Sequence, residues 1–167
     1  MKDPAHPNRV SLATVPLRHS VQGERFESDR RSLSRAAGGR ALGCSHMRVP
    51  PGKSAWPRHF HLANEEAVYV LSGSGTARVG DDVLPLRPGD YLALPAGAGH
   101  AHRIDNDGAE PLEYLIFSTM NDPDVMVYPD SNKLAVFAGS PPGGDASVRH
   151  FETVLDLAAQ REYWDGE

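Results

Sequence analysis

Residues 52–73 read GKSAWPRHFHLANEEAVYVLSG and carry two histidines, His59 and His61, with one residue between them. Side chains two positions apart in a β-strand point to the same face, so these two imidazoles can reach one point. Glu66 follows His61 by five positions and precedes the apolar run AVYVL. A bend between them can bring its carboxylate beside the imidazoles, and this donor set suits divalent zinc, iron, manganese, nickel or copper. The segment therefore predicts part of a metal site in a β-rich region.

A second pair of histidines, His100 and His102, lies in residues 89–106, GDYLALPAGAGHAHRIDN. These two side chains also share one face of an extended segment. One nitrogen from this pair would complete a set of three histidines and one glutamate. Cys44 is the only cysteine, which excludes both an intrachain disulfide and a closed thiolate metal site.

Short apolar segments separated by turn residues make up most of the chain after residue 41. Glycine and proline together account for 30 of the 167 residues, well above average usage, and this excess indicates many turns. Strands with turn signals roughly every eight to twelve residues are typical of an antiparallel sandwich or barrel, so the predicted fold class is all-β. The expected strands cover residues 41–49, 67–71, 76–79, 83–86, 91–94, 100–104, 112–119, 125–128 and 134–137.

The two ends of the chain have a different character. Residues 1–20 contain three prolines and no sustained periodicity, so we expect a loose N-terminal arm before a single domain over residues 21–167. Residues 152–161 place apolar side chains at helical spacing and predict a short helix, followed by the irregular tail YWDGE.

Composition argues against several classes of partner. The net charge of −5 disfavours a nucleic-acid partner, although residues 18–40 hold six arginines against three acidic residues and predict a solvated or partner-facing segment. No apolar run approaches the roughly 18 residues of a membrane span. The polar N-terminus has no apolar signal region, so we expect a cytoplasmic protein with no membrane partner.

The spacing of these residues resembles the two signatures of the cupin superfamily. The first signature corresponds to Gly52, His59, His61, Glu66 and Gly73, and the second to Gly89, Pro95, Gly97, a histidine and Asn106. Beyond these signatures, most of the chain after about residue 20 resembles single-domain bacterial cupins. The resemblance implies a cupin-type antiparallel β-barrel, or jelly roll, whose mouth holds a metal ion. It also implies that His59, His61, Glu66 and one histidine of the second signature are the metal ligands.

The fourth ligand has two candidates because this sequence departs from the usual spacing. Counting forward from Gly97 selects His100, whereas counting back from Asn106 selects His102. We favour His102, since Asn106 begins the turn after the strand and therefore fixes how far along the strand the histidine lies. His100 then remains a residue of the pocket rim or an alternative ligand.

The resemblance implies a metal-dependent isomerase, lyase or dioxygenase that acts on a small oxygen-rich molecule, such as a sugar derivative or an enolisable carbonyl compound. It does not choose among these reactions, because one barrel and one ligand set serve many. A non-catalytic module that binds a small ligand and a barrel with a purely structural metal are the alternatives. The resemblance further implies a homodimer. The catalytic residues are left unassigned, and the candidates for a general acid or base are His46, Arg48, His100, Glu113 and Tyr114.

Overall fold

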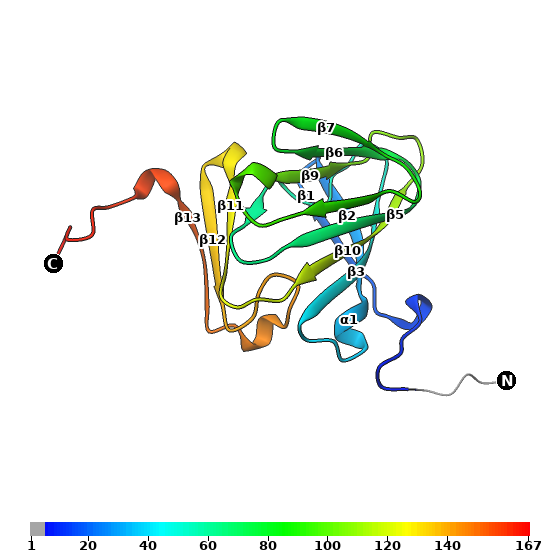
Figure 1. Ribbon diagram of the computed structural model, residues 1–167, viewed down its shortest axis with the longest axis horizontal. Helices are drawn as coiled ribbons and strands as arrows, with labels where there is room; N and C mark the ends of the chain where they lie inside the picture. Colours follow the sequence, from blue (N-terminus) through cyan, green and yellow to red (C-terminus); the bar gives the residue numbers. More distant parts are fainter. Residues whose placement is uncertain (1–5) are drawn as a thin grey trace.

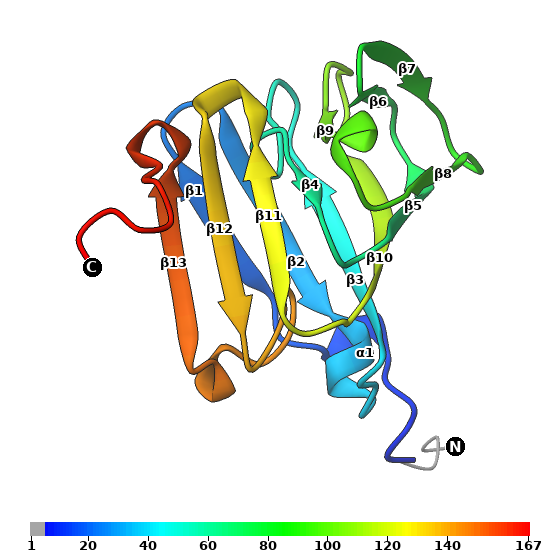
Figure 2. The same cartoon turned by 60° about the vertical axis from the view of Figure 1, so that its left-hand side comes forward.

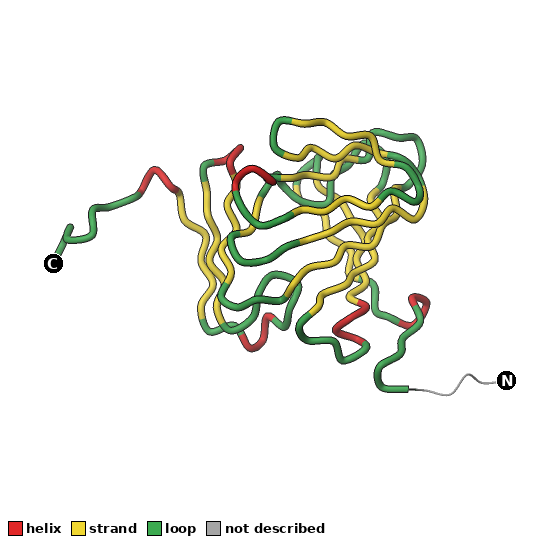
Figure 3. The backbone as a smooth tube through the Cα atoms, viewed as in Figure 1, coloured by secondary structure: helices red, strands yellow, loops and turns green. Residues whose placement is uncertain are grey.

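The computed structural model describes residues 6–167, which form a mostly β, antiparallel structure (Figures 1 and 3). Among residues 6–167, the helical elements are one short α-helix, α1 (Leu33–Ala36), and single 3₁₀ turns. The strands are β1 (Arg18–Gln22), β2 (Phe26–Ser32), β3 (Leu42–Val49), β4 (Phe60–His61), β5 (Glu66–Ser72), β6 (Gly75–Val79), β7 (Asp82–Leu86), β8 (Tyr91–Leu94), β9 (His102–Asp105), β10 (Leu112–Thr119), β11 (Asp124–Tyr128), β12 (Lys133–Ala138) and β13 (Phe151–Asp156).

The largest sheet has the strand order β1-β2-β3-β10-β5-β8. A four-stranded sheet, β13-β12-β11-β4, faces it across the interior, and the small sheet β7-β6-β9 lies at one end of the molecule (Figure 2). Neighbouring strands such as β3 and β10 come from distant parts of the sequence. The arrangement is a jelly roll, in which two sheets enclose one interior.

The hydrophobic core lies between the sheets and follows the alternation of the strands. In β3, Met47 and Val49 are fully buried, whereas Arg48 between them is exposed. The core cluster consists of Met47, Val49, Ala55, Val68, Val70, Ala77, Leu86, Leu94, Ile104, Leu112 and Tyr114. A second, smaller cluster joins Met126, Ala135 and Phe137 of β11 and β12.

The helix expected at residues 152–161 is wrong. Residues 151–156 form β13, which pairs with β12 along its length, and only a 3₁₀ turn over Leu157–Ala159 follows. Val154, Leu155, Leu157 and Ala158 have the spacing of a helical face, yet backbone pairing with an open sheet edge satisfies more hydrogen-bonding groups than one short, exposed helix.

The expected N-terminal arm is shorter than residues 1–20. Its residues 1–5 lie outside the described part of the chain, but β1 begins at Arg18 and pairs with β2 as a hairpin through Gly23. Strand β2 was not predicted, because FESDRRS carries few apolar residues to mark a buried face. Within residues 6–167, no helix is long and apolar enough to cross a membrane.

Gly73 shows why the first signature ends in glycine. Its φ of +79° lies in the left-handed region, and a Cβ at this position would collide with the backbone of Pro111 and Leu112. Gly89 also has a positive φ, of +94°, but a Cβ there would meet nothing within 4 Å. The close approach at Gly73 lets the turn after β5 pass beside the start of β10.

We expect Gly73→Ala to lower the free energy of unfolding by at least about 3 kcal/mol, because backbone strain and a steric clash add together. Gly89→Ala, which introduces the strain alone, is the control and should cost about 1 kcal/mol. Urea unfolding followed by circular dichroism measures both. Equal losses for the two variants would contradict the close approach at Gly73.

Candidate metal centre

Two backbone hydrogen bonds join the two histidine motifs. The amide of His59 donates to the carbonyl of His102 at 3.0 Å, and the amide of His102 donates to the carbonyl of His59 at 2.7 Å. His61 lies in β4, which pairs with β11, while Glu66 begins β5 and His102 begins β9. Three strands from three sheets and the residue before β4 thus bring these four side chains close together.

The three imidazoles direct the same ring nitrogen toward one carboxylate oxygen. Nε2 lies 4.0 Å from Glu66 Oε2 in His59, 3.5 Å in His61 and 3.1 Å in His102. Potential ligand atoms of His59, His61 and Glu66 all lie within 4.8 Å of one another. All four side chains are largely buried, with at most 12% of any side chain exposed.

The opposite ring nitrogen of each histidine is held by an oxygen acceptor. Nδ1 lies 2.8 Å from the carbonyl of Pro57 in His59, 2.6 Å from Asp124 Oδ2 in His61 and 3.0 Å from the carbonyl of His100 in His102. An imidazole whose Nδ1–H donates to such an oxygen presents the lone pair of Nε2 when the ring is neutral. These three bonds therefore fix the tautomer and the ring orientation that metal binding requires.

Asp124 is a functional residue that the sequence reasoning missed. Its carboxylate is fully buried, contacts His61 and also accepts the backbone amides of Ala63 and Val125. Burial opposes ionisation of Asp124, but its hydrogen bonds, above all that from His61, outweigh this and lower its pKa. The only sequence signal was an acidic residue at the start of an apolar strand, 63 positions from His61.

The titratable side chains of the site shift one another's pKa values. Burial lowers the pKa of His61, but its hydrogen bond to Asp124 and the nearby negative charge of Glu66 outweigh it and raise that pKa to about 9. Burial, with the neighbouring His102, lowers the pKa of His59 to about 4. Burial favours the neutral form of Glu66, yet its hydrogen bond to His102 and the nearby charge of His61 hold its pKa well below the usual range. Glu66 is therefore an anion and His61 a cation at neutral pH.

These residues fit a divalent cation. The Nε2 atom of His61 is buried and has no hydrogen-bond partner among residues 6–167, although it points at the Glu66 carboxylate. A buried polar atom without a partner costs about 1–3 kcal/mol, and a cation beside Glu66 would remove that cost. Imidazole nitrogens and a carboxylate are the donors that transition-metal ions prefer.

His100 does not join this cluster. It ends the 3₁₀ turn Ala98–His100, and the part of it that reaches the site is its carbonyl, which holds Nδ1 of His102. Its ring is half-buried and absent from the lining of the cavity beside Glu66.

The other candidates for acid–base chemistry separate into two groups. His46 and Arg48 lie on the outer face of β3 and both contact Glu113, at 3.1 Å and 3.3 Å, so these three form a cluster away from the cavity. Tyr114 is fully buried on β10, and its hydroxyl has no hydrogen-bond partner in the described part of the chain. Burial and the negative charge of Glu66 raise its pKa, so Tyr114 keeps its proton.

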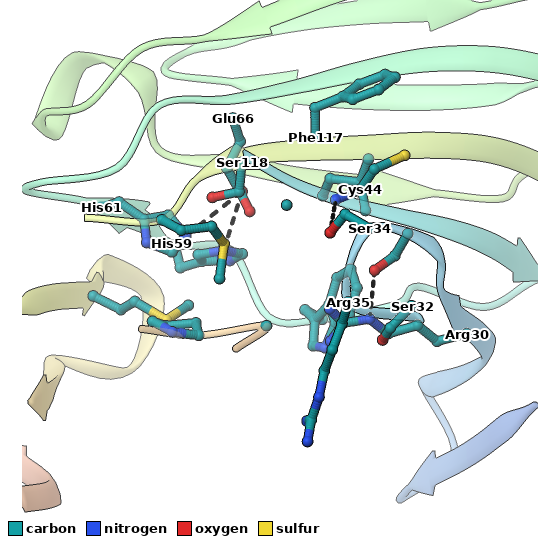
Figure 4. Close-up of a pocket in the computed structure, with 18 residues that line it drawn as sticks. Arg30, Ser32, Ser34, Arg35, Cys44, His59, His61, Glu66, Phe117 and Ser118 are labelled. Atoms are coloured by element: carbon teal, nitrogen blue, oxygen red, sulfur yellow. Dashed lines mark hydrogen bonds and ion pairs between the residues drawn. The ribbon is translucent and has the colours of Figure 1, made fainter. Parts of the chain in front are cut away.

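A cavity of about 120 Å³ opens beside His59, His61 and Glu66. Figure 4 shows these three side chains on one side of it and Arg30, Ser32, Ser34 and Arg35 on the other. The wall between them includes apolar side chains such as Ile116 and Met126. The cavity is large enough for a small molecule that contacts the histidines and Glu66 at one end and the arginines and serines at the other.

Comparisons with known proteins agree with this geometry. A family model described as Cupin domain matches residues 45–118. The crystal structure of a putative sugar phosphate isomerase from Acidithiobacillus ferrooxidans superposes with a TM-score of 0.76 at 31% identity, covering 93% of this chain and 96% of that one. This chain belongs to the cupin superfamily.

Two further similarities extend the comparison. A sugar phosphate isomerase of the cupin superfamily from Silicibacter pomeroyi also has a TM-score of 0.76, at 23% identity over 94% of this cupin and 98% of that chain. Quercetin 2,3-dioxygenase from Bacillus subtilis is 31% identical over 72 residues, which are 39% of this cupin but only 21% of that enzyme. The cupin thus spans about a fifth of the length of that dioxygenase.

We expect metal binding by this cupin to release about one proton at pH 7, because His61 must lose the proton that its pKa of about 9 retains. The apparent affinity for Zn²⁺ should therefore rise up to about tenfold per pH unit below pH 9 and level off above it. Titration calorimetry in buffers of different ionisation enthalpy counts the protons. Asp124→Asn removes the main partner of His61, so this control should release fewer protons. A proton count that the variant leaves unchanged would contradict the role given to Asp124.

Proposed function

We propose that this cupin is a metal-dependent enzyme that acts on a small oxygen-rich molecule, such as a sugar derivative or an enolisable carbonyl compound. One divalent transition-metal ion, held by His59, His61, Glu66 and His102, is its cofactor. The observation that carries this proposal is the convergence of three Nε2 atoms on one buried carboxylate, each ring fixed from behind through Nδ1. A barrel that needed only a structural metal would gain nothing from the cavity beside these residues.

Isomerisation is the reaction that the comparisons favour within this proposal. The relatives aligned over nearly their whole length carry the descriptions putative sugar phosphate isomerase and sugar phosphate isomerase. The dioxygenase similarity covers a smaller share of both chains. We therefore infer a carbonyl or hydroxyl substrate in preference to an aromatic one.

The residues of the chain have distinct roles in this proposal. A bound divalent ion supplies Lewis-acid stabilisation of negative charge on a substrate oxygen. Asp124 orients His61 and supports its basicity, while the Pro57 and His100 carbonyls orient His59 and His102. Tyr114 lines a separate small pocket with His59 and His102 rather than the cavity beside Glu66, and it keeps its proton.

We expect His102→Ala to lose most of its bound metal, whereas His100→Ala should retain it. The reason is that His102 supplies a ring nitrogen to the site, while His100 contributes a backbone carbonyl that the substitution leaves in place. Elemental analysis of protein purified without chelator measures both and identifies the ion. Full occupancy in His102→Ala with loss in His100→Ala would overturn this choice of fourth ligand.

We expect the metal-loaded protein to turn over at least one compound in a panel of sugar phosphates, oxalate-like acids and diketones. Coupled assays and NMR of the product mixture measure turnover. Tight binding of one compound without any turnover would instead identify a binding module. The expected homodimer stays a prediction, which sedimentation equilibrium tests against the 18.1 kDa mass of one chain.

A further inference from the structure

The end of the cavity opposite the metal centre is basic and hydroxyl-rich. Arg30 and Ser32 come from β2, Ser34 comes from α1, and all three line the same cavity as His59, His61 and Glu66 (Figure 4). This end belongs to the arginine-rich segment that the sequence predicted to be solvated or partner-facing. The structure instead turns one of its arginines inward.

Arg30 is held in place but keeps most of its donors free. Its Nε donates to Ser45 Oγ at 3.0 Å, and its guanidinium lies over the ring of Trp56 at 6.0 Å from the centroid. Within residues 6–167 it forms no ion pair with a carboxylate. The other arginine of the cavity differs, because Arg35 is paired with Asp145 at 2.7 Å.

Burial and the charge of nearby Arg18 lower the pKa of Arg30. The charge of Glu66 opposes this shift, but no carboxylate of residues 6–167 pairs directly with the guanidinium, and an anion that enters the cavity would supply such a partner. The planar fork of an arginine also matches a carboxylate or a phosphoryl group in two parallel hydrogen bonds.

The hydroxyl groups beside Arg30 can add to such a contact. The oxygen of Ser34 accepts the backbone amide of Cys44, so its O–H remains free to donate. Gly143 covers the guanidinium closely, since a Cβ at this residue would lie 3.1 Å from the Nη2 atom of Arg30. The glycine therefore lets the loop after β12 close over Arg30 without displacing it.

We propose that Arg30 binds an anionic group, a carboxylate or a phosphoryl group, of the same small molecule whose oxygens reach the metal centre. The substrate is then a hydroxy or carbonyl compound with an acidic group at one end, and a neutral sugar binds much less tightly. This inference rests on the proposed function for the position of the metal, but the anion site is defined by Arg30, Ser34 and Trp56 alone.

The two tryptophans of the chain allow a direct test. Trp164 is exposed in the C-terminal tail, so Trp164→Phe leaves Trp56, beside Arg30, as the single fluorescent reporter. Glycerol, glycerate and glycerol 3-phosphate are titrated into this protein as purified, with its metal content determined. We expect saturable changes in Trp56 fluorescence with at least one of the two anions and none with glycerol. The anion that binds with the higher affinity shows whether the site prefers a carboxylate or a phosphoryl group.

Arg30→Gln in the same background should weaken anion binding by about 10- to 100-fold, the range of one charge-assisted contact. Arg30→Lys should lose less, because it keeps the charge but not the fork. Arg35→Gln is the matched control in the same cavity and should change binding by less than about fivefold, since Arg35 is already paired and half exposed. Thermal unfolding confirms that each variant is folded.

Anion binding that Arg30→Gln leaves unchanged would overturn the proposal, as would equal affinity for glycerol and both anions. Low metal content together with Arg30-dependent anion binding would contradict the metal-dependent enzyme and support the anion site. Full metal content without anion binding would contradict the anion site alone.

Discussion

The exchange of backbone hydrogen bonds between His59 and His102 is the contact on which the site depends. It joins the loop before β4 to the start of β9 and so places two ring nitrogens from distant segments beside each other. Neither segment is a long strand, and β4 itself has only two residues. The precise geometry of the site therefore comes from this pair of backbone hydrogen bonds and from three oxygen acceptors, one for the Nδ1 atom of each histidine.

The same arrangement separates the charges of the three imidazoles. Three imidazoles around one carboxylate would repel one another if all were charged, but their environments separate their charges. His59 stays neutral because burial and its neighbours disfavour the cation, whereas His61 is held as a cation between two carboxylates. The proton on His61 thus supplies the positive charge that a bound metal ion would supply. This makes metal affinity a function of pH through His61.

Much of the site could be predicted because it is encoded in local spacing. The alternation of side chains in an extended segment puts His59 and His61 on one face. The asparagine after β9, Asn106, fixes the position of β9 along the barrel, because it donates to the carbonyls of Val49 and Glu110. That anchor is why counting back from Asn106 led to the histidine that lies beside Glu66. The cupin signatures also specified the jelly roll, since they mark where its turns must fall.

The parts that could not be predicted depend on contacts between distant residues. Asp124 meets His61 only because β11 pairs with β4, and no spacing in the sequence reports that pairing. Arg30 lies in a run of mixed charges with no apolar alternation, so its inward direction follows from the pairing of β2 with β3. Strand β13 shows the reverse error, in which a local helical pattern lost to an available sheet edge.

The distance between the two ends of the cavity sets the size of the molecule it can take. Ser45, which holds Arg30, pairs with Ile116 on β10, and Ile116 pairs in turn with Val68 on β5, the strand that Glu66 begins. The anchor of the guanidinium and the carboxylate are therefore two strands apart, about 10 Å across the sheet, and Glu66 lies two residues before Val68 on β5. A molecule that contacts both ends must span this separation past Ile116 and Met126, which also line the cavity, and a single small anion would leave one end unfilled.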